Sequence, residues 1–142
     1  MFSRICRHGA LAVSGLVLLA LASASSASSD SALRGQWKGQ THLDGEKATS
    51  ATSLTVADGE GHLRIDGSTH CSISGAVEPA NAGDGSCWQL KTRDAHGSSM
   101  CDALSKGELL VCTGEGRVMR LEARYSKEGH DLKRLGTLGH YP

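Results

Sequence analysis

Apolar and polar residues alternate with a period of two along much of the chain after residue 33. The clearest run covers residues 119–125, where apolar side chains at odd positions alternate with charged ones at even positions. Successive side chains of a strand point to opposite faces, so this run predicts a strand with one buried and one solvated face. Weaker forms of the pattern predict further strands over residues 36–43, 71–77, 88–93 and 130–135, with turns at 95–97 and 127–129.

A hairpin is predicted over residues 54–65, where two apolar-alternating segments flank an Asp-Gly-Glu-Gly sequence. Glycine at the first central position suits a type II′ turn, whose twist matches that of the flanking strands, so we centre the turn on Gly59-Glu60. This register places Val56 opposite Leu63. It also gathers the apolar side chains of both strands on one face.

Disulfides are expected from the cysteines that follow the N-terminal region, which are Cys71, Cys87, Cys101 and Cys112. An even number of cysteines is typical of the disulfide framework of a small exported domain. A second predicted hairpin, with Lys106-Gly107 as its turn, would set Cys101 directly opposite Cys112, within the distance that a disulfide tolerates. We therefore favour Cys101–Cys112 and Cys71–Cys87. Four cysteines permit three connectivities, and the sequence does not decide among them.

Together these patterns predict one all-β domain over residues 33–142. We expect a small antiparallel meander of about eight strands with two disulfides and without a helical segment. Closure, or near closure, into a β-barrel is favoured because it removes exposed strand edges. A β-sandwich is the alternative architecture.

The N-terminal region has a different character. Basic residues precede an apolar run over residues 11–22, which is too short to span a bilayer and is followed by small residues. These features predict a signal peptide over residues 1–24, cleaved after Ala24 or Ala27, and a disordered tether over residues 25–32. An uncleaved N-terminal anchor is the alternative. We therefore expect the protein to be periplasmic or secreted.

The charge balance narrows the range of partners. The chain contains 15 Lys and Arg residues and 15 Asp and Glu residues, and removal of the predicted signal peptide takes away Arg4 and Arg7. The slight negative excess, together with the lack of a basic cluster in the sequence, argues against nucleic acid or an anionic membrane as the partner. After cleavage the sequence would retain no apolar segment long enough to cross a membrane.

The segment LRGQWKG at residues 33–39 resembles the Gly-x-Trp opening of calycin-type barrels, such as lipocalins, avidins and nitrobindin-like proteins. The resemblance implies an up-and-down barrel. It also implies structural roles for two residues. Trp37 would plug one end of the barrel, and Arg134, in the last predicted strand, would pack over it.

The sequence contains no catalytic signature. It lacks a Gly-x-Ser-x-Gly elbow and an H-E-x-x-H metal motif. His62 and His70 lie on neighbouring predicted strands, but solvated histidines are expected there rather than a metal site. Most of the carboxylates that a hydrolase would need fall in predicted turns or polar loops; the candidates are Asp66, Glu78, Asp84, Asp94 and Asp102. We therefore predict no enzymatic activity, cofactor or metal.

Two binding functions follow from this description. The first is an exported protein-binding module, such as an inhibitor or immunity-type protein against an envelope enzyme, which would use loops 44–50, 77–86 and 94–99. The second is a calycin-like carrier of a small apolar ligand in a cavity lined by Leu54, Ile65, Ile73, Leu90 and Leu121. An envelope protein without a defined ligand is a third hypothesis. A solid core with a protruding loop would favour the first hypothesis, a deep apolar pocket the second, and a flat polar surface the third.

Overall fold

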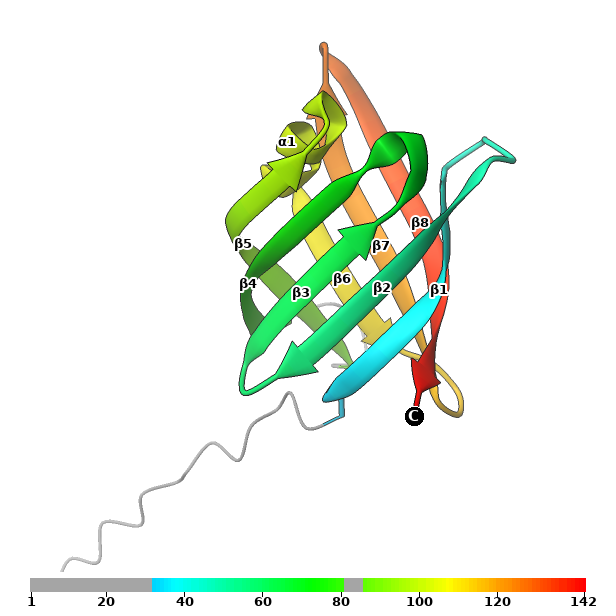
Figure 1. Cartoon of the computed structure of the whole chain (residues 1–142), viewed down its shortest axis with the longest axis vertical. Helices are drawn as coiled ribbons and strands as arrows, with labels where there is room; N and C mark the ends of the chain where they lie inside the picture. Colours follow the sequence, from blue (N-terminus) through cyan, green and yellow to red (C-terminus); the bar gives the residue numbers. More distant parts are fainter. Residues whose placement is uncertain (1–31, 81–85) are drawn as a thin grey trace, which may run out of the picture.

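The computed structural model describes residues 32–80 and 86–142, and these residues form a closed antiparallel β-barrel (Figure 1). The eight strands are β1 Gly35–Leu43, β2 Thr49–Ala57, β3 Glu60–Ile65, β4 Cys71–Ala80, β5 Cys87–Gly97, β6 Glu108–Thr113, β7 Val118–Lys127 and β8 His130–Tyr141. Each strand pairs with its neighbour in sequence, and β8 returns to pair with β1. The predicted fold class is therefore confirmed.

The alternating pattern of β7 positions its side chains as expected. Met119, Leu121 and Ala123 are buried, whereas Arg120 and Arg124 are exposed. β8 is longer than predicted and continues beyond residue 135 to pair with residues 36–43 of β1. Glycine permits this close pairing, because a Cβ atom at Gly136 would meet the backbone of β1.

The predicted turn at residues 127–129 is present between β7 and β8. The predicted register of the β2–β3 hairpin, in contrast, is wrong. Leu63 lies opposite Leu54, not Val56, because the turn is centred on Asp58-Gly59. Both turn residues have positive φ, as a type I′ turn requires. The register differs by two residues, so every side chain keeps its predicted face and the hairpin still buries its apolar side.

Two short helical segments, η1 Gly67–Thr69 and α1 Ser99–Ser105, correct the prediction of a chain without helices. Helix α1 occupies the segment that was predicted to be the first strand of the second hairpin. Cys101 and Leu104, three residues apart on one face of this helix, are each 1% exposed and join the core. The predicted turn at residues 95–97 is also wrong, since β5 extends to Gly97.

The disulfides are Cys71–Cys101 and Cys87–Cys112, so both favoured pairings are wrong. Cys101 lies on α1 and cannot form a strand pair with Cys112. Instead, α1 packs against the start of β4, where Cys71 lies, and the β5–β6 ladder places Cys87 directly opposite Cys112. Two disulfides are typical of an oxidising, extracytoplasmic compartment.

The interior of the barrel contains one continuous cluster of buried side chains. It includes all five residues that were predicted to line a ligand cavity, and none of them is more than 5% exposed: Leu54, Ile65, Ile73, Leu90 and Leu121. These side chains pack against one another within the core. A dense interior of this kind is typical of a filled barrel.

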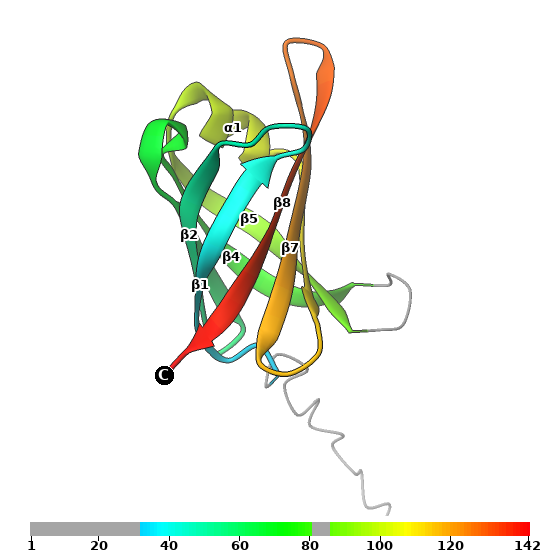
Figure 2. The ribbon, with the colours of Figure 1, turned by 90° about the vertical axis from the view of Figure 1, so that its right-hand side faces the viewer.

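The barrel has two different ends (Figure 2). At the helix end lie α1, η1, the β1–β2 connection and the β7–β8 turn. At the terminal end lie the start of β1, the end of β8 and the β2–β3 turn. Within residues 32–80 and 86–142, no helix has the length and apolar character needed to cross a membrane. The predicted signal peptide, and the predicted tether apart from Ala32, lie outside the described residues.

Candidate binding site at the helix end of the barrel

Polar side chains are buried inside the barrel toward the helix end. Among the described residues, the buried polar or charged side chains are Thr41, Thr52, Thr69 and Arg134. The strand ladders place them near one another: Arg134 lies opposite Leu43 near the end of β1, and Thr52 lies near the start of β2. Thr69 belongs to η1. The interior is therefore polar at this end.

Arg134 is the centre of a hydrogen-bond network. Its Nη1 atom donates to the Thr41 hydroxyl at 3.1 Å, and its Nη2 atom donates to the Thr69 hydroxyl at 3.4 Å. The Thr41 hydroxyl also hydrogen-bonds the Thr52 hydroxyl at 2.8 Å. The threonines thus orient the guanidinium group with neutral oxygen atoms.

No carboxylate neutralises Arg134. Within residues 32–80 and 86–142 this side chain forms no ion pair, and its Nε atom has no hydrogen-bond partner. Arg134 is nevertheless only 5% exposed. Burial of a charge without an opposite charge is costly, by several kcal/mol in typical proteins.

Tyr125 completes the buried polar group. Its hydroxyl donates to the Met100 sulfur at 3.2 Å. Burial raises the pKa of Tyr125 above its ordinary value, and the negative charge of Glu46 raises it further, whereas the nearby Arg134 guanidinium lowers it through charge and a hydrogen bond. The raised pKa widens the pH range over which the phenol of Tyr125 stays protonated and can donate a hydrogen bond.

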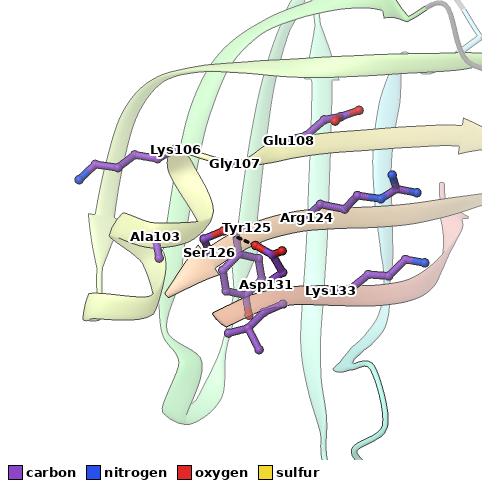
Figure 3. Close-up of a pocket in the computed structure, with 10 residues that line it drawn as sticks. Ala103, Lys106, Gly107, Glu108, Arg124, Tyr125, Ser126, Asp131 and Lys133 are labelled. Atoms are coloured by element: carbon purple, nitrogen blue, oxygen red, sulfur yellow. Dashed lines mark hydrogen bonds between the residues drawn. The ribbon is translucent and has the colours of Figure 1, made fainter. Parts of the chain in front are cut away.

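A surface cleft of about 510 Å³ lies beside this group (Figure 3). It is formed by the C-terminal part of α1, the start of β6, the end of β7 and the start of β8. Its lining residues are Ala103, Lys106, Gly107, Glu108, Arg124, Tyr125, Ser126, Asp131, Leu132 and Lys133. The wall formed by Tyr125 and Leu132 is apolar, and the surrounding side chains are charged. Tyr125 therefore belongs both to the cleft and to the buried polar group.

Charged residues of both signs line the cleft. Glu108, Arg124 and Lys133 are neighbours across three adjacent strands. The Ser126 hydroxyl donates to Asp131 at 2.7 Å, which fixes that carboxylate at the rim. An arrangement of both charge signs recognises a complementary surface better than it recognises a uniformly charged polymer.

The terminal end is built differently. Trp37 is 5% exposed, and its indole nitrogen donates to the Leu33 carbonyl at 2.7 Å. The ring of His140 packs edge-on against it, with ring centres 5.0 Å apart. Arg134 does not pack over Trp37, contrary to the role implied by the calycin resemblance. The β1–β8 ladder pairs Trp37 with His140 and places Arg134 six positions further along β8, a separation of roughly 20 Å.

Two of the three predicted binding loops lie at the helix end, namely those near residues 44–50 and 94–99. Much of each segment is strand: β2 begins at Thr49, and β5 continues to Gly97. The predicted loop 77–86 lies at the other end of β4, and its residues 81–85 fall outside the described residues.

The other candidate groups are not brought together into a catalytic or metal site. In the part of the chain that the structure describes, no three His, Cys, Asp or Glu side chains form a potential metal site. Asp66, Asp94 and Asp102 form surface ion pairs with neighbouring basic residues. Glu78 is exposed, and Asp84 lies outside the described residues.

Sequence reasoning missed the cleft and the role of Tyr125. The cleft joins α1 to the β7–β8 hairpin, and α1 was not predicted. One sequence signal was present: Arg134 stands at an inward-facing position of a strand whose pattern is otherwise apolar there.

Comparisons with protein-family models, curated proteins and solved structures find no match to this chain.

Proposed function

We propose that this domain is a periplasmic or secreted binding module that holds a protein partner at the helix end of its barrel. An inhibitor or immunity-type role against an envelope enzyme is the form of this function that we favour. The observation that supports it most directly is the contrast between a filled interior and an open cleft of about 510 Å³ beside α1.

Rigidity supports this proposal. The barrel is closed, and Cys71–Cys101 attaches α1 to β4 at the helix end. A surface that is ordered before binding loses little conformational entropy on association, so more of the contact energy appears as affinity. The cleft edges belong to strands and a disulfide-anchored helix, which fits a preformed binding surface.

A carrier of an apolar ligand in the barrel interior receives less support. Leu54, Ile73 and Leu121, which would line the cavity, are at most 2% exposed and belong to the packed core. A ligand that replaced these contacts would have to separate packed side chains and create a cavity, at a substantial cost in free energy.

Site-specific photo-cross-linking tests the proposal. A photoreactive amino acid would replace Glu108 or Lys133, which line the cleft, and Val118, which is 36% exposed at the terminal end, as the matched control. We expect one discrete cross-linked protein from the cleft positions in the cells that produce the domain, and none from Val118. Equal products from all three positions would contradict the proposal, as would no product together with a co-purifying small molecule in native mass spectra.

A further inference from the structure

Arg134 is a buried cation whose hydrogen-bond partners are neutral hydroxyls. The hydroxyls of Thr41 and Thr69 accept from its terminal nitrogens. Tyr125 is buried on the neighbouring strand β7, two positions from Ala123, which lies opposite Arg134. Other buried polar atoms without partners in the described barrel include the indole nitrogen of Trp88 and the hydroxyl of Ser98, which carry no charge. Arg134 alone combines full charge, 95% burial and an unused donor at Nε.

The hydrogen bonds of Arg134 within the barrel do not explain its burial as a contribution to the stability of the fold. A buried guanidinium stabilises a fold when carboxylates satisfy it, whereas an uncompensated one is often improved by an apolar residue of similar volume. Here the hydrogen bonds are two neutral contacts of 3.1 and 3.4 Å, weaker than the charge-assisted pairs that arginine forms with carboxylates. The group is therefore suited to an anion that is not part of the barrel.

The charges favour a monoanion. Arg134 is the only charged side chain that is buried among the described residues, so one positive charge is available in the interior. The nearby carboxylate of Glu46, whose charge raises the pKa of Tyr125, would oppose a second negative charge at this end. A carboxylate carries one charge and matches the planar fork of arginine, whereas a phosphate monoester carries nearly two.

Apolar side chains lie close to the polar group. Leu43, Met100, Ala103 and Leu132 are half-buried and pack against the core at the helix end. A carboxylate that reached Arg134 would therefore place the carbon atoms next to it against apolar surface. This surface favours an acid with a short apolar body over an inorganic anion.

We propose that Arg134 and Tyr125, at the helix end of the barrel, form a binding site for a single carboxylate attached to a short apolar group. The carboxylate belongs either to a free small acid or to an acidic side chain of a bound protein. The inference does not depend on the protein-binding function proposed above, because a free acid can occupy the site in the absence of any partner.

The test uses the mature, oxidised domain and two probes, hexanoate and its neutral counterpart hexanamide. We expect hexanoate to shift the NMR resonance of the Arg134 Nε–H group and to raise the melting temperature in a concentration-dependent way. Hexanamide should do neither. Arg134→Met should abolish the hexanoate response while leaving the ligand-free melting temperature equal to or higher than that of the wild type. Arg64→Met, a substitution at an exposed arginine, should retain the full response.

A second arm identifies the source of the carboxylate. A peptide with blocked termini and a single Glu would be compared with the same peptide carrying Gln. A response to the Glu peptide that exceeds the response to hexanoate assigns the site to a partner's side chain, and the reverse assigns it to a free acid. The proposal is overturned if neither probe acts, or if hexanamide acts as strongly as hexanoate. The titrations of the wild-type domain test the carboxylate site even if Arg134→Met fails to fold. The cross-linking experiment tests the protein-binding function separately.

Discussion

The two ends of this barrel differ in the polarity of their buried side chains. At the terminal end, Leu33, Trp37, Met119 and Leu138 form a fully apolar layer, and each is at most 5% exposed. At the helix end, threonines and Arg134 occupy the equivalent interior positions. Each end has its own disulfide. The terminal end therefore has an interior that favours stability, whereas the helix end contains the buried charge on which the proposed binding site depends.

The largest effect is expected at the terminal end. Trp37→Ala should lower the free energy of unfolding by about 3–5 kcal/mol, because it removes a large buried ring and leaves a cavity. Leu132→Ala, at the helix end, should cost much less, since Leu132 is only half-buried. Chemical denaturation of both variants measures the difference. Equal losses would show that the two ends are equally important for stability.

The disulfides should have similar global effects and different local ones. Their sequence separations are 30 and 25 residues, so replacing either pair with serines should cost about 3–4 kcal/mol in the chain-entropy model. Only loss of Cys71–Cys101 releases α1 from β4. Hydrogen exchange should then show faster exchange in α1 for that variant. Unchanged protection of α1 would mean that Leu104 and its neighbours hold the helix without the disulfide.

A smaller effect is expected from the hydrogen-bond network. Thr41→Val keeps the shape of the side chain but leaves Arg134 and Thr52 each without one partner, so it should cost about 1–3 kcal/mol. Thr137→Val, at an exposed position of β8, is the control and should stay within about 0.5 kcal/mol. In the double variant Thr41→Val/Arg134→Met most of the loss should disappear. Persistence of the full loss would show that Thr41 acts independently of Arg134.

The smallest effect is the pH dependence due to Tyr125. Its pKa is raised in the folded protein above the ordinary value of 10.0, so folding favours the protonated phenol. Stability is therefore lost as the pH rises from about 10 through the raised pKa. Tyr125→Phe should lose less stability than the wild type between about pH 8 and about pH 11. Tyr141→Phe, at an exposed residue, should behave as the wild type does.

Much of the fold could be predicted because strand patterning is local. The buried face of β7 and the turn at Glu128-Gly129 depend on residues close in sequence, and both are present as predicted. The disulfide pairing could not be predicted in the same way, because it depends on α1, a helix of 7 residues. Its apolar positions are Met100, Cys101, Ala103 and Leu104, and a segment this short contains spacings that fit both a helical and a strand period.

The site was harder to predict because it depends on register. Arg134 was selected as a structural residue, but its distance from Trp37 is set by how β1 pairs with β8, and that pairing joins opposite ends of the domain. The lack of an ion pair between Arg134 and any described carboxylate is a property of the assembled interior. The cleft likewise requires α1 to pack beside the β7–β8 hairpin, which no local pattern encodes.

The pairing of β8 with β1 has a consequence for how the domain assembles. Every other strand pairing joins neighbours in sequence, whereas this one joins Gln36 to Tyr141 and closes a loop of nearly the whole domain. Both disulfides of the described barrel lie within residues 71–112, so neither crosses this junction. We therefore expect its closure to be the slow, entropically costly step of folding, because it joins residues far apart in sequence. Until it occurs, two unpaired strand edges are open to other chains.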